Sequence, residues 1–424
     1  MKSVLVILAE FYPYPSSNTN CVEPFLYGLL NEGYEVDVVT RRHDISLPTQ
    51  ESYNGLNIIR VDDYKTMNTV AFSKLLKNKT NKYLKIINNS LSFISKVFFS
   101  INYRDLYGEQ RYAGWDIKEV MNTCINLNET QKYNFILSIS HPIITHRIAY
   151  GLKKEFKTSK WAIFEFDPFA YNDDEYGRFN RKKRVLQESE LFKQCDKVFL
   201  TPELFEFYKD TPLNKFSEKF HEFNFPNMNE ISFESEKSLL KKQEGKYDAV
   251  YGGALLKTIR NPVFMMSFLQ ELNDIVNVTI MSNSRVRFLK KEIKKMSSLN
   301  FYSGQNKEIA HATMLDSDIL VNIGNTVVFQ TPGKIFEYMS MGKPIIHFSK
   351  IQNDPSIKYL KKYPLLFIVN EKSLDIEKEI ENCRKFIVEN KGKKITFEEV
   401  IKCMPEMDSD YIVGSFLEQI SSLN

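Results

Sequence analysis

The sequence predicts an α/β fold class with two Rossmann-like domains, and two observations support this prediction. Short apolar runs rich in β-branched residues alternate with longer segments of helical period, which is typical of parallel sheets covered by helices. This alternation occurs twice along 424 residues, a length that favours more than one domain because a domain usually spans about 150 residues. We therefore expect two α/β domains that face each other across a cleft.

The expected strands are short runs rich in Val and Ile, as buried strands of parallel sheets are. In the first half of the chain they are 4–9, 35–40, 57–61, 134–140, 161–166 and 197–200. In the second half they are 248–252, 276–281, 299–302, 319–323, 344–348 and 365–369. The domain boundaries that follow are an N-terminal domain over 1–214, a polar linker over 215–246, a C-terminal domain over 247–405 and a terminal segment over 406–424. The terminal segment contains an amphipathic helix that could pack on either domain.

The composition excludes several classes of protein. Hydrophobic residues make up 43% and charged residues 26%, which excludes a disordered chain and a polytopic membrane protein. The net charge of +4 is too small to indicate a nucleic-acid partner, and we expect none. Five scattered cysteines form no CxxC pair, so a reducing compartment, the cytoplasm, is expected.

The segment 64–104 differs in charge from the rest of the chain. It contains no Asp or Glu, while Lys and Arg alternate with Leu, Ile and Phe. A basic amphipathic segment of this kind can lie on an anionic membrane surface, where each basic side chain contributes about 1 kcal/mol. Such contact would place the protein at the inner face of the cell membrane. The other interpretation is a pair of core-packing helices with a solvated lysine face, and both stay open.

A helix-to-strand unit is expected within 330–346. Thr331 is the expected N-cap, Pro332 the first helical residue and Gly342 the residue that ends the helix. The helix follows the strand 319–323, and in an open α/β sheet the carboxyl ends of the strands face the ligand crevice. This placement makes the start of the helix a candidate ligand site.

Three residues of that helix suit a phosphorylated, hydroxylated ligand. Free N–H groups near Gly333 and Lys334 would point at an anion, as helix N-termini do. Glu337, one turn further, could hydrogen-bond a hydroxyl group. The alternative is an ordinary helix-to-strand unit without a ligand.

The run Pro332-x-Lys334-Ile335-Phe336-Glu337-Tyr338-Met339-x-x-Gly342-Lys343-Pro344 resembles the donor-site motif of GT-B glycosyltransferases. The resemblance is to the large retaining family that includes sucrose and glycogen synthases. It implies that the helix start binds the phosphates of a nucleotide sugar and that Glu337 binds the ribose hydroxyls. Such enzymes often carry a second glutamate eight positions upstream, where this sequence has Phe329.

The stretch 251–262 resembles the first strand and loop of a GT-B C-terminal domain. There Gly252 and Gly253 would permit close approach, and basic side chains would hold the diphosphate. Arg260, and secondarily Lys257, are the candidates, because a guanidinium suits bidentate phosphate contacts. The usual arginine directly after the glycine is replaced by Ala254, so Arg260 carries the prediction. The alternative is a basic surface loop.

Weaker resemblances extend over more of the chain. The loop 303–306, with Gly304, is similar to the loop that holds the nucleobase, although a glycine turn needs no ligand. Residues 10–15 and 29–40 resemble the opening of the acceptor-side domain in the same superfamily. The glycine pair that is usual between them is replaced by residues 16–20.

Two residues of the N-terminal half are candidate catalytic groups. His141 follows an expected strand, where a ring nitrogen could bond a donor sugar hydroxyl or act in acid–base chemistry. Asp167 lies in a segment that resembles the D-P-W element of related bacterial glycosyltransferases, and could position or deprotonate an acceptor hydroxyl. The alternatives are a loop-capping histidine and an Asx turn before proline. His146 is expected to be structural, inside a helix.

Two DxD sequences, at 316–318 and 408–410, are expected to be caps, and no metal site is predicted. The resemblance implies a cytoplasmic, metal-independent, retaining glycosyltransferase that uses a nucleotide diphosphate sugar and no other cofactor. The acceptor would be a saccharide, a lipid-linked saccharide or a protein in bacterial cell-surface polysaccharide or glycoconjugate assembly. The alternatives are a non-catalytic GT-B-like binding protein and a sugar-nucleotide epimerase.

Overall fold

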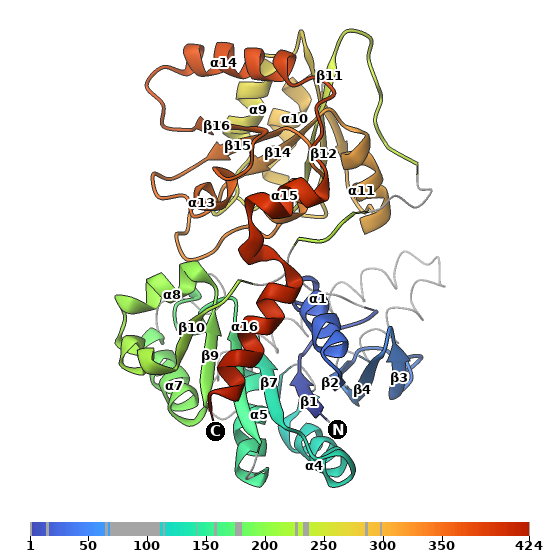
Figure 1. Ribbon diagram of the computed structural model, residues 1–424. Coiled ribbons are helices and arrows are strands. Elements are labelled where there is room, and N and C mark those ends of the chain that lie inside the picture. Colours follow the sequence, from blue (N-terminus) through green and yellow to red (C-terminus); the bar gives the residue numbers. More distant parts are fainter. Residues whose placement is uncertain are drawn as a thin grey trace, which may run out of the picture. The chain divides into compact units, whose positions relative to one another are not determined.

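The chain divides into two compact units. The computed structural model describes residues 2–13, 17–63, 67, 111–112, 115–140, 142–156, 159–173, 180–224, 228–231, 237–284, 287–296 and 299–423. The first unit comprises Met1–Phe225 and Ile412–Asn424, and the second comprises Pro226–Tyr411. Each unit has its own sheet covered by helices (Figure 1), which confirms the predicted α/β class with two parallel-rich sheets.

The first unit is built on an eight-stranded sheet of order β10-β9-β8-β7-β1-β2-β4-β3. Its strands are β1 (Lys2–Ile7), β2 (Tyr34–Arg42), β3 (Gln50–Tyr53), β4 (Leu56–Asp62), β7 (Phe135–Ile139), β8 (Lys160–Glu165), β9 (Lys197–Leu200) and β10 (Phe220–Glu222). A separate ribbon joins β5 (Arg111–Tyr112) to β6 (Trp115–Asp116). In the large sheet, neighbouring strands are parallel except for β3, which runs antiparallel to β4. Every strand expected in this half is present, with small shifts of its ends.

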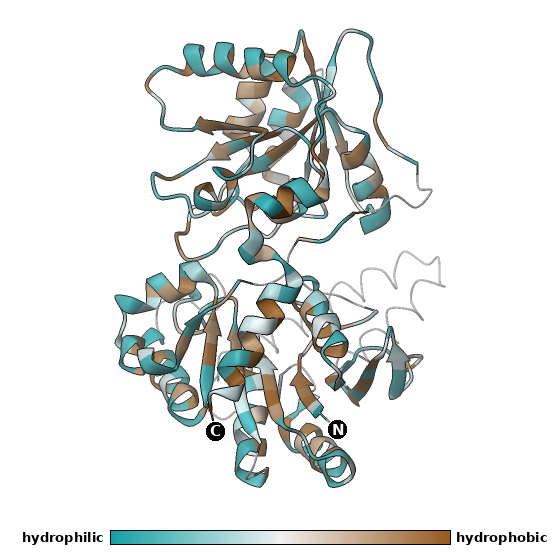
Figure 2. Cartoon of the chain, in the orientation of Figure 1, coloured by the Kyte–Doolittle hydropathy of each residue, from teal (hydrophilic) through white to brown (hydrophobic). Residues whose placement is uncertain are grey.

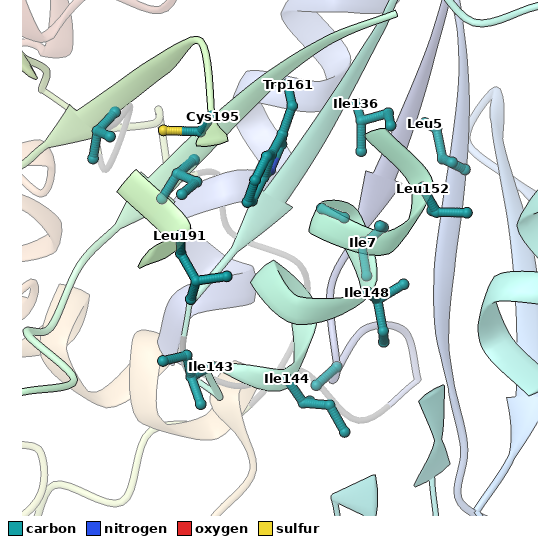
Figure 3. Close-up of a cluster of buried hydrophobic side chains, with 14 of the residues drawn as sticks. Leu5, Ile7, Ile136, Ile143, Ile144, Ile148, Leu152, Trp161, Leu191 and Cys195 are labelled. Atoms are coloured by element: carbon teal, nitrogen blue, oxygen red, sulfur yellow. The ribbon is translucent and has the colours of Figure 1, made fainter. Parts of the chain in front are cut away.

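Helices cover both faces of this sheet because successive strand residues point to opposite faces. The helices are α1 (Ser17–Asn31), α4 (Ile117–Gln131), α5 (Ile144–Glu155), α7 (Arg181–Gln194), α8 (Pro202–Lys209), the 3-10 helix η1 (Pro212–Lys219) and α16 (Ser409–Ser421). One core contains Leu5 and Ile7 of β1, beside Ile148 and Leu152 of α5 (Figure 3). The opposite core contains the alternate residues of β1 with side chains of α1 and α16.

The last helix, α16, belongs to the core of the first unit. Phe416 is fully buried, and its ring centroid lies 5.0 Å from that of Phe25, 5.5 Å from that of Phe164 and 4.9 Å from that of Phe199. The sequence left open which domain this helix contacts, and these ring contacts answer the question. The first unit also extends past the expected boundary at 214, because η1 and the edge strand β10 belong to it. The early residues of the predicted linker are therefore structured.

The second unit has a six-stranded parallel sheet of order β13-β12-β11-β14-β15-β16. Its strands are β11 (Tyr247–Gly252), β12 (Val276–Met281), β13 (Leu299–Tyr302), β14 (Ile319–Ile323), β15 (Ile345–Ser349) and β16 (Leu366–Asn370). Its helices are α9 (Val263–Gln270), η2 (Arg287–Leu289), α10 (Lys290–Lys295), α11 (Lys307–Asp316), α12 (Lys334–Ser340), α13 (Ile357–Leu360), α14 (Ile376–Glu389), α15 (Phe397–Cys403) and η3 (Pro405–Met407). Apolar residues concentrate in the strands of both sheets (Figure 2). The strand order reverses between β11 and β14, and such a reversal is the usual ligand position in open parallel sheets.

Two predictions lie outside the described residues. The basic segment 64–104 is described only at Met67, and His141 is not described. Within the described ranges, every helix is too short or too polar to span a bilayer.

Candidate functional site

Two loops meet where the strand order of the second unit reverses. The loop 253–262 follows β11 and the loop 324–333 follows β14, and these two strands are hydrogen-bonded neighbours. The N–H of Thr326 donates to the carbonyl of Ile259 over 3.1 Å, and the Thr326 hydroxyl donates to the carbonyl of Thr258 over 3.2 Å. Backbone contacts therefore hold the two loops together at the carboxyl edge of the sheet.

Arg260 is fixed at this edge by a fully buried amide. Its Nε and Nη2 atoms donate to Oδ1 of Asn325 over 3.1 and 2.8 Å. Asn325 has no exposed surface and donates through Nδ2 to the carbonyl of Gln330 over 3.1 Å. Backbone bonds in both directions between Arg260 and Leu256 close the turn that carries the arginine. The guanidinium is thus oriented by a neutral oxygen.

The charge of Arg260 is not compensated by a described carboxylate, since no ion pair joins it to an acidic residue in the part of the chain that the structure describes. Its remaining N–H groups can donate hydrogen bonds to an anion, and a guanidinium binds phosphate oxygens with charge-assisted hydrogen bonds. Lys257, on the same loop, is exposed, and its carbonyl accepts from Nδ2 of Asn261 over 3.3 Å. The loop therefore offers one oriented and one exposed cation.

The two glycines at the end of β11, Gly252 and Gly253, allow close packing but offer no free N–H. A Cβ on Gly252 would lie 2.9 Å from Sδ of Met314, and one on Gly253 would lie 3.2 Å from the Tyr251 hydroxyl. The N–H of Gly252 donates to the Tyr338 hydroxyl over 2.8 Å, and that of Gly253 donates to the carbonyl of Met281 over 3.0 Å. The predicted contact of these glycines with a ligand stays a prediction, and it would not use their N–H groups.

Glu337 on α12 is held as a carboxylate by two basic groups. His311 of α11 donates from Nε2 to Oε1 over 2.9 Å, while Nζ of Lys334 lies 2.6 Å from Oε1 and 2.7 Å from Oε2. Burial alone raises the pKa of Glu337, but the bond from His311 and the charge of Lys334 outweigh it and lower the pKa to about 2. An ionised carboxylate has about four acceptor positions, so Glu337 can still accept a ligand hydroxyl.

Tyr338 connects the Glu337 side of the site to the Arg260 side. Burial raises the pKa of Tyr338 well above its ordinary value, and the charges of Glu337 and Arg260 act on it with opposite sign. Its hydroxyl also binds both the N–H and the carbonyl of Gly252. Tyr338 therefore ties Gly252, at the end of β11, to α12, the helix that carries Glu337.

The start of α12 differs from the prediction. The expected N-cap, Thr331, makes no side-chain hydrogen bond within the described residues, and Gly333 occupies the N-cap position of a seven-residue helix. The first turn is closed by the N–H of Ile335, which donates to the carbonyl of Pro332, and the N–H of Phe336, which donates to the carbonyl of Gly333. This tight i→i−3 pattern places the start of the helix after Pro332. Gly342 ends the helix as expected, with a φ of 71°.

The N–H groups of Gly333 and Lys334 have no acceptor among the described residues, as expected for the first turn of a helix. The side chain of Lys334 binds Glu337 rather than standing free. Gly304 lies in the turn between β13 and α11 with a φ of 75°, and its N–H donates to Oδ1 of Asn283 over 2.6 Å. Phosphate binding at the helix start and base binding at Gly304 stay predictions.

Asp167, in the first unit, is half-buried and follows β8 near the buried carboxyl group of Glu165. The N–H groups of Phe169 and Ala170, just after Asp167, donate to Glu188 over 3.2 and 3.1 Å. Burial raises the pKa of Glu165 well above its ordinary value, and the nearby Asp167 raises it further. Burial likewise raises the pKa of Glu188. Asp167 is thus half-buried on a turn that a carboxyl group of α7 supports.

His146 is a core residue, as the sequence predicts. It lies in α5 at 2% exposure, with Nδ1 2.8 Å from the Ser138 hydroxyl and Nε2 3.3 Å from Oε2 of Glu165. Burial lowers the pKa of His146 to about 3, so the ring is neutral at ordinary pH.

At the two DxD sequences, as in the rest of the described residues, no group of three or more acidic, histidine or cysteine side chains is arranged to hold a metal ion. Asp408 caps α16, because its Oδ1 accepts from the N–H groups of Asp410 and Tyr411. In the sequence 316–318, Ser317 is the C-cap of α11, as expected, whereas Oδ2 of Asp318 accepts from the N–H of Asp248 over 2.8 Å and ties β11 to the start of β14.

Sequence reasoning missed two residues that the structure adds to the site, Asn325 and His311. Asn325 follows Ile323 and Gly324 at the end of an apolar strand, which was an available signal for a ligand-edge residue. His311 lies mid-helix without a motif, and only the folded chain brings it to Glu337.

Solved structures match the whole chain, whereas no protein-family model and no curated protein sequence matches it. Sucrose-phosphate synthase from Thermosynechococcus elongatus has a TM-score of 0.60 at 11% identity, and covers 100% of this chain and 95% of its own. The catalytic domain of starch synthase IV from Arabidopsis thaliana, bound to ADP and acarbose, has a TM-score of 0.62 at 9% identity and covers 100% and 99%. HepE from Anabaena, in complex with UDP and glucose, has a TM-score of 0.59 at 9% identity and covers 100% of both chains. The resemblance to GT-B glycosyltransferases is therefore confirmed at the level of the fold.

Proposed function

We propose that the protein is a glycosyltransferase that moves a sugar from a nucleotide diphosphate sugar to a hydroxyl acceptor. The proposal rests on the guanidinium of Arg260, which Asn325 orients at the point where the strand order reverses. Among the described residues, no carboxylate neutralises this guanidinium. The known structures of this fold support it, since HepE is complexed with UDP and glucose and starch synthase IV with ADP.

The proposed reaction breaks the bond between the anomeric carbon and the diphosphate oxygen. Negative charge builds up on the leaving diphosphate, and Arg260 stabilises it, with Lys257 as an additional cation. Glu337 accepts hydrogen bonds from the ribose hydroxyls. Its lowered pKa suits this role, because the carboxylate stays ionised over the physiological pH range. Asp167 takes the proton of the acceptor hydroxyl or orients it. His141, outside the described residues, is kept as a candidate for the donor sugar.

We propose that the transfer needs no metal ion, because protein cations supply the charge that a metal would otherwise bring to the diphosphate. Retention of the anomeric configuration is likewise proposed from the motif around Glu337. Phe329 stands where related enzymes often have glutamate, so the donor sugar is proposed to be held through other contacts.

The acceptor is proposed to be a saccharide, either free, lipid-linked or on a protein, in bacterial surface polysaccharide or glycoconjugate assembly. A cytoplasmic protein whose segment 64–104 contacts anionic lipid would suit the lipid-linked form. Sedimentation with vesicles of anionic lipid, compared with vesicles of neutral lipid, tests the membrane contact. Equal sedimentation with both would contradict it.

Titration of the purified protein with UDP-, GDP-, ADP-, CMP- and dTDP-linked sugars, with magnesium or with EDTA, tests the proposed function. We expect one nucleotide class to stabilise the protein equally in both conditions, by about 2.7 kcal/mol at a hundred times the dissociation constant. Arg260→Met and Glu337→Gln should lose this stabilisation. Their matched controls, Arg384→Met and Glu371→Gln, change ion-paired residues elsewhere in the second unit and should keep it.

Three outcomes separate the proposed function from its alternatives. Release of nucleotide diphosphate with formation of a glycosylated acceptor supports the transferase. Conversion of the nucleotide sugar without any acceptor would indicate an epimerase. Tight nucleotide-sugar binding with neither reaction, or no binding in the whole series, would indicate a non-catalytic binding protein.

A further inference from the structure

A hydrogen-bonded chain of three buried side chains lies beneath the Arg260 site. Asn322 on β14 and His347 on β15 are paired directly across the two strands. Asn322 donates from Nδ2 to Nδ1 of His347 over 2.8 Å, and His347 donates from Nε2 to Oδ2 of Asp354 over 3.0 Å. Asn322 is 2% exposed, and the side chains of His347 and Asp354 are fully buried. A neutral imidazole with its proton on Nε2 satisfies both bonds.

Asp354 is held as an acceptor at both of its oxygens. Its Oδ1 accepts from the N–H of Ser356 over 2.9 Å, and its Oδ2 accepts from His347. Burial raises the pKa of Asp354, but the bond from His347 and the N–H of Ser356 outweigh it and lower the pKa below its ordinary value. Asp354 is therefore a carboxylate with a fixed position.

The carboxylate lies directly against Gly324. A Cβ built on Gly324 would be 2.0 Å from Oδ2 of Asp354, so the space that a side chain would fill is taken by the carboxylate. The N–H of Gly324 donates to the carbonyl of Phe348 over 2.9 Å, which fixes the same turn from β15. The next residue is Asn325, whose Oδ1 is the acceptor for Arg260. Gly324, which Asp354 contacts, is therefore adjacent in the chain to Asn325, whose side-chain amide orients the Arg260 guanidinium.

We propose that Asp354, oriented by His347 and Asn322, is a positioning group that holds the turn at Gly324 and Asn325 and thereby sets the direction of the Arg260 guanidinium toward a diphosphate. Asp354 does not touch the ligand in this proposal and acts only through Asn325. The effect on ligand binding depends on the proposed function, whereas the effect on Arg260 does not.

Two substitutions disturb the contact from opposite sides. Asp354→Asn keeps the size of the side chain but provides one acceptor oxygen for two donors, His347 and Ser356. Gly324→Ala introduces a methyl group that must push the carboxylate away, and it does so without backbone strain because Gly324 has no positive φ. His347→Gln is the conservative variant, since its amide can still donate to Asp354, and His347→Leu is its counterpart without a donor. Asp318→Asn is the control, a carboxylate in the same sheet that bonds the N–H of Asp248.

The first readout is hydrogen exchange of the Arg260 Nε–H, followed by NMR and assigned by its loss in Arg260→Lys. We expect about tenfold faster exchange in Asp354→Asn, Gly324→Ala and His347→Leu, and a near-normal rate in His347→Gln and Asp318→Asn. This readout needs no ligand. If Asp354→Asn fails to fold, Gly324→Ala and the pair of His347 variants give the same comparison.

The second readout is the gain in affinity that a diphosphate adds to a nucleoside. UDP, GDP, ADP, CDP and dTDP are each compared with the parent nucleoside by calorimetry. We expect Asp354→Asn to reduce the diphosphate gain about tenfold while nucleoside affinity is unchanged, and to have no further effect when Arg260 is already Met. An unaltered Nε–H exchange rate in Asp354→Asn and Gly324→Ala would overturn the proposal, and so would additive losses in the double variant. Altered exchange without any nucleotide binding would uphold the positioning role and count against the proposed function.

Discussion

Removal of the Tyr338 hydroxyl tests how firmly α12 is joined to the end of β11. That hydroxyl accepts from the N–H of Gly252 over 2.8 Å and donates to its carbonyl over 3.2 Å, and the ring is fully buried. Tyr338→Phe keeps the ring, so it opens no cavity, but it leaves a buried N–H without an acceptor. Such a group costs about 1 to 3 kcal/mol, which corresponds to a change of about 5- to 150-fold in an opening equilibrium.

Hydrogen–deuterium exchange with mass spectrometry measures this effect on the peptide that contains β11. We expect exchange in that peptide to accelerate by the stated factor in Tyr338→Phe. The matched control is Tyr363→Phe, which removes another buried hydroxyl of the same unit, one that donates to the carbonyl of Lys343 over 2.7 Å. The control should leave β11 unchanged. Equal acceleration of β11 in both variants, or none in Tyr338→Phe, would refute the idea that this hydroxyl joins the two elements.

Three further predictions concern stability. Phe416→Ala should destabilise the first unit by about 3 to 5 kcal/mol, whereas Glu418→Ala, at an exposed position of the same helix, should have almost no effect. Denaturation followed by tryptophan fluorescence measures both, because the two tryptophans lie in the first unit. The stability that Glu337 contributes through its lowered pKa is present above about pH 5 and is lost as the pH falls toward 2. The melting temperatures of the wild type and Glu337→Gln should therefore converge on acidification, and divergence would contradict the assigned ion pairs. Gly342 has a φ of 71°, and a Cβ on it would lie 2.0 Å from the carbonyl oxygen of Ile395, whereas Gly392 has a φ of 68° and open space around it. Gly342→Ala should therefore lower the midpoint of unfolding clearly more than Gly392→Ala, which costs about 1 kcal/mol.

The strands of the second sheet could be predicted because each is a short run rich in apolar residues, as buried parallel strands are. The edge strand β3 could not, because its residues Gln50–Tyr53 are mostly polar and have no such pattern. A local signal for it existed in the turn at Asn54 and Gly55, where both residues have a positive φ, as the tight turn between β3 and β4 requires. Turn chemistry would therefore have extended the prediction to the sheet edge.

The site was predictable to the extent that it is local in sequence. Glu337 and Lys334 lie one helical turn apart, and the spacing alone brings them together. The bonds from Arg260 to Asn325 and from His311 to Glu337 join residues that are 65 and 26 positions apart, so they depend on the strand order rather than on any local pattern. The start of α12 was misplaced because a tight first turn, rather than a threonine cap, begins the helix.

The position of α16 has a consequence for how the protein is made. Its residues from Ile412 onward complete the first unit, although Pro226–Tyr411, the whole of the second unit, precedes them in the chain. On the ribosome, the aromatic surface formed by Phe25, Phe164 and Phe199 is therefore translated before the second unit but receives Phe416 only after the second unit has been synthesised. The first unit therefore starts to emerge before the second unit and is completed after it, and a chain that stops before Ile412 carries an uncovered aromatic face, the kind of exposed surface that promotes aggregation.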